Sequence, residues 1–328
     1  MKKVLSRVLS LLMVCAMALL LSGCSTADNK VIIYTSAEDY RVEYLTSRLK
    51  EEFPDYQIVI EYMATGNHAA KLKAEGTDTE CDITYDLEYP YLQELERQGI
   101  LTDLSSYDYS IYTDNVIESK HYLPEAIYSA SIIVNPAVLS AKGLEAPKSF
   151  EDLIKPEYKG LISMPNPKSS GTGFMVLKAY ANTYGEEAAF EYFDQLAQNV
   201  LQFTSSGSGP VNALIQQEVA IGLGMTAQAV TAINNGTPLD IYNFDSGSPF
   251  SVYGQSVIKG KESKPAVKAV FDFMMNTFNM ENNARFYPER IYKDTLNVIE
   301  NYPSDIVYCD MSNNTNEERQ RLLDKWKY

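Results

Sequence analysis

The chain has 328 residues, of which 43 are acidic and 28 are basic, and its formal net charge is −15 at pH 7. This acidic balance argues against a nucleic-acid-binding protein, because phosphate backbones are neutralised by lysine and arginine. The chain is also longer than one compact core usually serves, so we expect two lobes.

The first 23 residues are typical of a bacterial export signal. Lys2, Lys3 and Arg7 precede an apolar run over residues 8–21, and the sequence Leu-Ser-Gly-Cys at 21–24 matches a lipobox. The apolar run is shorter than the roughly 20 residues that a membrane span needs. The signal contains three basic and no acidic residues, so its removal changes the net charge from −15 to −18. By resemblance to bacterial lipoproteins, Cys24 is expected to carry the lipid, palmitate included. Residues 24–30 would then tether an extracytoplasmic body to the cell membrane.

Residues 31–130 are predicted to form the first lobe. Apolar strands at 31–34, 57–60 and 82–85 are each followed by a segment with helical spacing, at 44–53, 67–76 (capped by Asn67) and 91–97. This alternation predicts an α/β fold with a mainly parallel sheet, covered by helices on both faces. Ligands of such sheets bind at the carboxyl ends of the strands, so Ser36 in the loop at 35–39 is a candidate donor. Glu38 and Asp86 either contact an amino or hydroxyl group of a ligand or are solvated loop charges.

A long apolar run at 126–135 predicts a crossover into a second lobe, which would span residues 131–252. A return crossover is expected at 253–258, where Tyr253 either packs on a ligand or lines the hinge. Residues 253–328 would then return to the first lobe and add C-terminal helices near 266–275, 281–286 and 317–326.

The second lobe contains the most informative stretch, residues 165–174, which lies between an apolar strand and a helical segment. Ser169, Ser170 and Thr172 offer hydroxyl groups, and Gly171 permits close approach to the backbone. A helix start has unpaired N–H groups and a partial positive charge, so this stretch is a plausible seat for a phosphate, phosphonate or carboxylate. The alternative is that Ser170 or Thr172 only caps its own helix, and the two functions are compatible.

Two further stretches point to the same place. Residues 204–210 repeat the hydroxyl-rich pattern between a strand and a helix, and Ser205 and Ser206 are its candidate donors. The strand at 220–224 is followed by Thr226 and Gln228, which we expect to face the same cleft. Two hydroxyl-rich loops in one chain predict a shared site.

Catalytic and metal chemistry have little support in the sequence. The two histidines, His68 and His121, show no metal-ligand spacing, and no nucleophile elbow accompanies them. We therefore expect no enzyme activity, no cofactor and no metal site. Cys81 and Cys309 either form one disulfide or remain two separately buried thiols.

The order of these features resembles a bacterial extracellular solute-binding protein. The resemblance rests on the lipobox, on Tyr-Thr-Ser at 34–36, on Leu-Lys-Ala-Glu-Gly at 72–76 before Cys-Asp-Ile, on Pro-Glu-Tyr-Lys-Gly at 156–160 and on the serine-rich loop that follows. The similar branch contains receptors of ABC importers for ferric iron, 2-aminoethylphosphonate and sugar phosphates. It implies a two-lobed fold of the periplasmic-binding-protein type (type II) that closes around a solute. Such a protein would need no cofactor, act as a monomer and present the solute to a permease.

The chain departs from the iron receptors of that branch. Those receptors carry adjacent tyrosines after the strand at 220–223, whereas this chain reads Gly-Met-Thr-Ala-Gln at 224–228. Ferric iron prefers anionic oxygen ligands, which methionine and alanine do not supply. We therefore expect a small anionic solute, phosphorylated or phosphonylated. An iron receptor of the same family and a sensor lipoprotein that signals to a membrane histidine kinase remain the alternatives.

Overall fold

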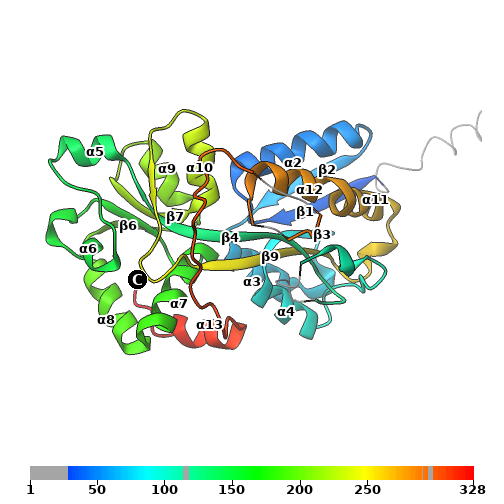
Figure 1. Cartoon of the computed structure of the whole chain (residues 1–328). Helices are drawn as coiled ribbons and strands as arrows, with labels where there is room; N and C mark the ends of the chain where they lie inside the picture. Colours follow the sequence, from blue (N-terminus) through cyan, green and yellow to red (C-terminus); the bar gives the residue numbers. More distant parts are fainter. Residues whose placement is uncertain (1–28, 114–117, 290, 295–297) are drawn as a thin grey trace, which may run out of the picture.

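A computed structural model describes residues 29–113, 118–289, 291–294 and 298–328 of the protein (Figure 1). Two lobes are joined by strands β4 (Leu123–Val134) and β9 (Phe250–Val257). The export signal at 1–23, Cys24 and the tether up to residue 28 lie outside the described residues.

The first lobe is built on a sheet with the order β2-β1-β3-β9-β4. Strands β1 (Lys30–Thr35), β2 (Gln57–Tyr62) and β3 (Ile83–Glu88) are parallel, and β9 runs antiparallel to β3. Val31 and Ile33 of β1 belong to the core under helices α2 (Asp39–Glu52) and α11 (Pro265–Phe273). Ile32 and Tyr34 point to the opposite face, under α3 (Thr65–Glu75) and α4 (Tyr89–Arg97). The period-two alternation of a strand thus buries both faces of the sheet, and the predicted alternation of strands and helices is confirmed.

The second lobe repeats this plan. Strands β6 (Val200–Thr204), β5 (Ile162–Pro165) and β7 (Ile221–Met225) are parallel, and the end of β4 pairs antiparallel with β7 and with the short β8 (Asp240–Tyr242). Helices α7 (Gly171–Tyr184) and α8 (Glu186–Leu196) pack on one face, and α9 (Gly209–Ile215) and α10 (Thr226–Asn234) pack on the other. Each lobe therefore has three parallel strands completed by antiparallel ones. The short helices α5 (Pro136–Ala141) and α6 (Phe150–Leu153) lie outside this plan.

Strand β4 is the structural link between the lobes. All of its residues are buried, and its first part, up to Ser129, pairs with β9. From Ala130 onward it pairs with β7 instead. The predicted crossovers at 126–135 and 253–258 overlap β4 and β9, which run side by side through the middle of the molecule (Figure 1).

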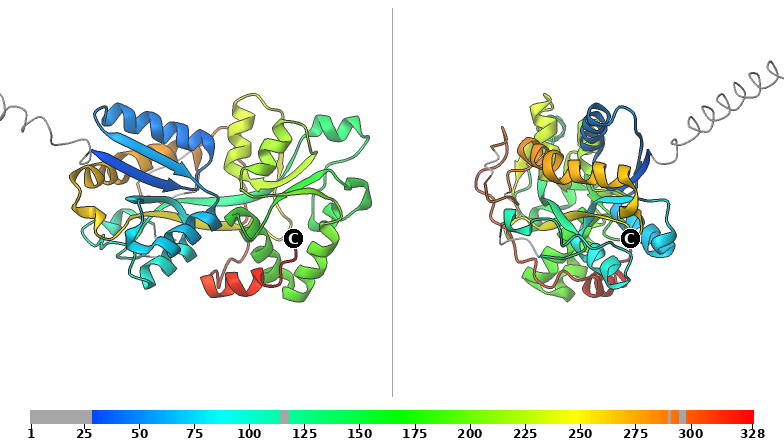
Figure 2. Two further views of the ribbon diagram at one scale, coloured as in Figure 1. Left: turned by 180° about the vertical axis from the view of Figure 1, so that it is seen from behind. Right: turned by 90° about the vertical axis from the view of Figure 1, so that its right-hand side faces the viewer.

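The C-terminal part of the chain contacts both lobes. After α11, a turn of π-helix (Met274–Phe278) and α12 (Asn279–Phe286) complete the first lobe. The last helix, α13 (Asn316–Leu323), lies against α7 and α8 of the second lobe (Figure 2), where Leu322, Leu323 and Trp326 join the core. The last part of the segment at 253–328 therefore packs on the second lobe.

Three local expectations need correction or resolution. The helix expected to be capped by Asn67 begins earlier, at Thr65, and the third strand runs to Glu88, so Asp86 lies in a strand and not in a loop. Cys81 and Cys309 are two separate, buried, free thiols. None of the helices in the described ranges is long and apolar enough to span a bilayer.

Candidate functional site

A small cavity lies between the two lobes, where polar groups from both converge. It is lined from the first lobe by Ser36, Glu38, Tyr62, Thr65 and Asp86, from the second by Ser170, Thr172, Gly207, Ser208 and Met225, and from the connecting strands by Tyr128 and Tyr253. Its volume is about 20 Å³, which is enough for roughly one water molecule. The lobes touch beside it, where the Gly66 N–H donates to the Ser169 carbonyl over 3.0 Å. This is a closed arrangement, and a small molecule can enter only if the lobes part.

A larger hollow of about 890 Å³ lies elsewhere, beside Ile127 of β4 and Phe250 of β9. It shares no lining residue with the interlobe cavity. We place the candidate site in the small cavity because residues from five strands and two helices meet there, as expected at the carboxyl ends of the strands of an α/β sheet.

The wall formed by the second lobe is the start of α7. Ser170 is the N-cap, and its hydroxyl accepts a hydrogen bond from the Gly173 N–H over 3.3 Å. No acidic residue occupies the first turn of this helix, so its positive end is not neutralised from within. Thr172 is 3 % exposed and lines the cavity. The capping function of Ser170 is therefore real, and it coexists with a position in the cavity wall.

Close packing explains the glycines at this helix start. A Cβ atom added at Gly171 would lie 2.0 Å from the hydroxyl of Tyr253, and one added at Gly173 would lie 2.4 Å from the Pro165 carbonyl oxygen. One added at Gly207 would lie 2.4 Å from the Thr172 hydroxyl, so the second hydroxyl-rich loop directly contacts the first. The two loops form one continuous wall.

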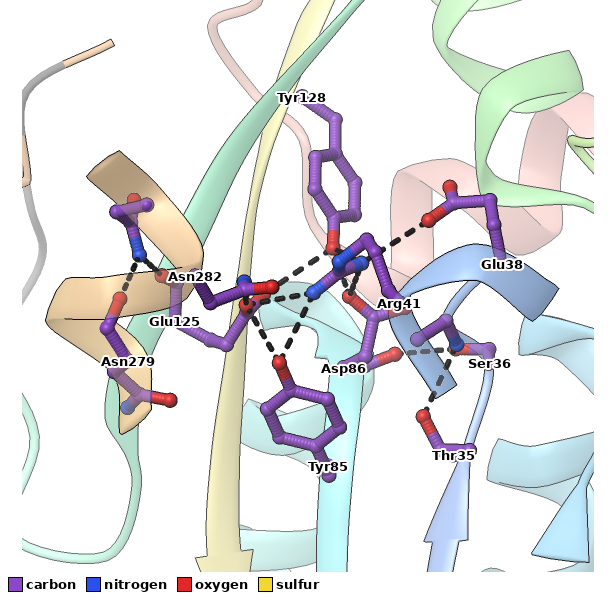
Figure 3. A network of polar contacts seen from close by, with 12 residues as sticks. Thr35, Ser36, Glu38, Arg41, Tyr85, Asp86, Glu125, Tyr128, Asn279 and Asn282 are labelled. Atoms are coloured by element: carbon purple, nitrogen blue, oxygen red, sulfur yellow. Dashed lines mark hydrogen bonds and ion pairs between the residues drawn. The ribbon is translucent and has the colours of Figure 1, made fainter. Parts of the chain in front are cut away.

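The wall formed by the first lobe is a charge cluster centred on Arg41, a fully buried residue of α2 (Figure 3). Its guanidinium donates to Asp86 over 3.0 Å, to Glu38 over 3.2 Å and to Glu125 over 2.6 Å, and also contacts the Tyr128 hydroxyl. Three carboxylates thus share one cation. Since Glu38 and Asp86 also line the cavity, this wall presents negative charge that Arg41 only partly neutralises.

Burial dominates the electrostatics of this cluster. It raises the pKa of Glu38, against the opposing effect of Arg41 and with a further increase from Asp86. Burial likewise raises the pKa of Glu125 to about 7. Crowding of acidic groups around one arginine therefore favours retention of a proton in the cluster.

The backbone at Asp86 is unusual for a strand. Its φ is +60°, in the left-handed region, and it lies where the pairing of β3 with β9 shifts between Thr84 and Leu87. The Asp86 carbonyl also accepts a close hydrogen bond from the Ser36 hydroxyl. Non-glycine residues adopt this conformation at an energetic cost, and such residues cluster at functional sites. Here the irregular backbone directs the Asp86 carboxylate toward Arg41 and the cavity.

The predicted site residues divide into two groups. Ser36, Ser170, Thr172 and Tyr253 line the cavity, and Gly171 packs against Tyr253. The remaining five lie outside its wall: Ser169, Ser205, Ser206, Thr226 and Gln228.

These five residues have other partners. Ser169 contributes its carbonyl to the contact between the lobes, Ser205 is exposed, and Ser206 bonds with Ser208 over 3.0 Å. Gln228 donates to the Ser208 carbonyl over 3.3 Å. The expectation that Thr226 faces the cleft is wrong, because α10 begins at this residue and its hydroxyl turns back to Ser131 of β4, at 2.7 Å.

Arg41, Tyr62, Thr65 and Tyr128 are site residues that the sequence reading did not identify. Arg41 carried one usable signal: it precedes Leu45 and Leu49 at intervals of four residues and so lies on the apolar side of its helix. An arginine at such a position needs buried partners, and the acidic residues nearby are the candidates. Tyr128 had no such signal, since it lies in a uniformly buried strand.

The histidines do not contribute to this site. His68 is buried in α3 and bonds with the Thr84 hydroxyl at 3.0 Å, and His121 bonds with the Thr102 carbonyl at 2.9 Å. Across the ranges that the structure describes, no three His, Cys, Asp or Glu side chains are grouped so as to hold a metal ion.

Comparison with known proteins agrees with this architecture. Residues 79–290 match the family model of the bacterial extracellular solute-binding proteins. Among solved structures, the periplasmic binding protein AfuA of Actinobacillus pleuropneumoniae, with fructose 6-phosphate bound, is 23% identical. The superposition of the two structures has a TM-score of 0.79 and covers 90% of this chain and 97% of the AfuA chain. Iron-bound HitA of Pseudomonas aeruginosa is 18% identical, with a TM-score of 0.72 and coverage of 90% and 97%.

One curated relative is named for polyamine ligands, which are cations and not phosphorylated anions. The spermidine/putrescine-binding periplasmic protein of Escherichia coli is 24% identical over 277 residues, which cover 79% of this chain and 77% of the relative. These relatives and neighbours are binding proteins and not enzymes. With a family model matching well over half of its length, the chain belongs to the bacterial extracellular solute-binding proteins, which bind a small solute and deliver it to an ABC permease.

Proposed function

We propose that this protein is the receptor of an ABC importer for a small phosphorylated or phosphonylated solute. The observation that carries the proposal is the start of α7, which brings a helix N-terminus with no acidic residue in its first turn and the Thr172 side chain to the cavity between the lobes. Helix N-termini bind such anions through free N–H groups and the helix dipole. The bound sugar phosphate of the AfuA neighbour supports the same ligand class.

The opposite wall restricts the other end of this solute. Glu38 and Asp86 face the cavity with only Arg41 to neutralise them, so a second anionic group would be repelled there. A hydroxyl or ammonium group would instead donate hydrogen bonds to the carboxylates. The proposed solute therefore has an anionic end on the second lobe and a hydrogen-bond-donating end on the first.

The strength of these contacts suffices for a receptor. Hydrogen bonds that involve a charged group contribute about 1.5–3 kcal/mol each. Four or five of them match the roughly 8 kcal/mol of a micromolar complex before the costs of ordering are subtracted. Because the groups that would bind the solute come from both lobes, the solute would bind the closed form better than the open form and shift the hinge equilibrium toward closure.

Ferric iron is the second candidate, favoured by one observation. Tyr62, Tyr128 and Tyr253 line the cavity together with two carboxylates, and these are oxygen donors that iron accepts. However, the Tyr128 hydroxyl and the Asp86 carboxylate are already bonded to Arg41, whose positive charge would oppose a bound cation. We therefore place iron second.

Calorimetry of the purified protein against a panel of solutes tests this proposal. The panel contains sugar phosphates, alkyl- and aminoalkylphosphonates, inorganic phosphate, ferric citrate and spermidine. We expect micromolar binding of phosphorylated or phosphonylated organics and weak or no binding of spermidine. Tight iron binding without any response to the organic anions would contradict the proposal.

Two variants, one at the N-cap of α2 and one within this helix, examine the far end of the solute. Glu38→Gln should weaken binding of the amino- or hydroxyl-bearing member of the panel while leaving inorganic phosphate unaffected. Glu43→Gln is the matched control, because Glu43 is an exposed residue of the same helix. Equal loss in both variants, or none in either, would remove Glu38 from the site.

The lipid anchor, the extracytoplasmic location and the monomeric state form part of the same proposal. The lipobox at 21–24 supports acylation of Cys24. Cys24→Ser should release the protein from the membrane fraction of the producing cells, and mass spectrometry of the wild-type N-terminus should show the acyl chains. Light scattering should give the mass of one chain; a wild-type protein that is soluble and unacylated would contradict the anchor.

A further inference from the structure

The end of the C-terminal segment is anchored in the second lobe. Leu322 and Trp326 are buried in the core of that lobe, and Lys178 of α7 forms an ion pair with Glu318 at 3.2 Å. The amide of Asn166 donates to the carbonyl of the last residue, Tyr328, over 3.1 Å. Opening of the cleft would therefore carry α13 away together with the second lobe.

One side chain of α13 reaches the first lobe. Arg319 is 2 % exposed and forms a close ion pair with Glu88, which is fully buried at the end of β3. Its guanidinium carbon lies 4.7 Å from the ring centre of Tyr91 in α4, and 3.9 Å from that of Phe174 in α7. Since Nε and Nη1 of Arg319 have no hydrogen-bond partner among the described residues, Glu88 is its hydrogen-bonding anchor in the first lobe.

Glu88 connects this ion pair to the candidate site. One of its carboxylate oxygens accepts a hydrogen bond from Ser251 of β9 over 2.7 Å, and the other lies 3.0 Å from the position of a Cβ at Gly171. Asp86, two residues earlier on the same strand, lines the cavity. A second, exposed ion pair also joins α13 to the first lobe, because Arg97 of α4 and Glu317 of α13 lie 2.6 Å apart.

We propose that Arg319 and Glu88 form a latch between the lobes, which is made when the cleft closes and broken when it opens. Both are positioning residues: they hold the start of α7 against β9 and do not themselves line the cavity. The C-terminal helix thereby becomes part of the closing mechanism, although it lies outside the residues that match the family model.

The latch stabilises the closed form because its two buried charges compensate each other. Two opposite charges that are buried together compensate each other, whereas the loss of one leaves the other buried without a partner. Truncating one partner of a buried pair across an interface typically costs at least about 30-fold in the equilibrium between bound and free. Applied to the lobes, loss of Arg319 should lower the ratio of closed to open molecules by about the same factor.

Cross-linking between the lobes can measure this ratio without any solute. Cysteines at positions 97 and 317 (Arg97→Cys and Glu317→Cys) are introduced into the otherwise unchanged protein, and a short bismaleimide links them only in the closed form. In this background Arg319→Gln and Glu88→Gln should each slow cross-linking by about 30-fold or more. The double variant should be slowed by less than the product of the two single effects, because the residues act as a pair.

Arg321→Gln is the matched control. Arg321 lies on the same helix but pairs with Glu318 and Glu186, both carried by the second lobe or by α13 itself. It should leave the cross-linking rate unchanged. If Arg319→Gln and Glu88→Gln also cross-link at the parental rate while only the melting temperature falls, the pair is merely structural and the latch is refuted. Should Arg319→Gln fail to fold, Glu88→Gln decides the question alone.

Discussion

A methyl group at Gly171 should act as a wedge between the lobe that carries α7 and the connecting strand β9. The added Cβ would lie 2.0 Å from the Tyr253 hydroxyl, whereas contacts of Cβ atoms below 3.0 Å are essentially never seen, so the hydroxyl must move by about 1 Å. The cavity offers only about 20 Å³, too little for a displaced ring. Overpacking of this kind costs about 1–3 kcal/mol, which corresponds to roughly 5- to 150-fold weaker closure around a solute.

Calorimetry with the best solute of the panel measures this effect in Gly171→Ala. The melting temperature without solute should stay near the wild-type value if the lobes can open, because alanine is favoured over glycine in a helix. Tyr253→Phe provides a partial suppressor: it removes the clashing oxygen, and the nearest remaining atoms, Glu88 Oε2 at 3.0 Å and the ring Cζ at 3.2 Å, need to shift by only a few tenths of an ångström. Wild-type affinity of Gly171→Ala, or a double variant much weaker than Tyr253→Phe alone, would refute the reasoning.

Two further predictions concern a hydroxyl and a histidine. Thr172→Val should weaken binding of the phosphorylated solute about 10- to 150-fold in calorimetry, because it removes one charge-assisted hydrogen bond. Thr183→Val on the same helix, whose hydroxyl bonds with the Ala179 carbonyl at 2.9 Å, should have no effect on binding; a loss in both would argue against a direct contact. The second prediction is that His68 makes the free energy of unfolding depend on pH. Burial lowers the pKa of His68 to about 3, from about 6.5 in the unfolded chain. As the pH falls below 6.5 the unfolded state takes up a proton that the folded state does not, so stability is lost on acidification. Urea unfolding should therefore show wild type losing about 2 kcal/mol more than His68→Gln between pH 7 and pH 5, with His121→Gln as control. Equal losses in wild type and His68→Gln would show that His68 is not the group responsible.

The features that the sequence predicted well are those with local signatures. The alternation of Val31 and Ile33 with Ile32 and Tyr34 marks a strand buried on both faces, and the hydroxyls around Gly171 mark a helix start. Helical spacing marks Arg41 as a residue on the apolar side of α2, but two of its partners, Asp86 and Glu125, are 45 and 84 positions away in the chain. No periodicity signals such pairing.

The error at Thr226 has a different origin. Strand periodicity was extended past Met225, but the backbone there changes from strand to helix without an intervening loop. Each helical residue rotates by about 100°, so the side chain turns away from the direction that period-two alternation predicts. Residues at the junction of a strand and a helix are therefore poorly placed by periodicity alone.

The change of partner by β4 between Ser129 and Ala130 has a consequence for how the protein is recognised. One strand, β4, is shared by the sheets of both lobes and acts as a pivot. Because it is hydrogen-bonded to β9 before this position and to β7 after it, the main motion left to the lobes is a rotation about the junction. We expect two discrete conformations, open and closed, and few intermediates. A membrane partner can then distinguish them by the shape of the protein, without contacting the bound solute.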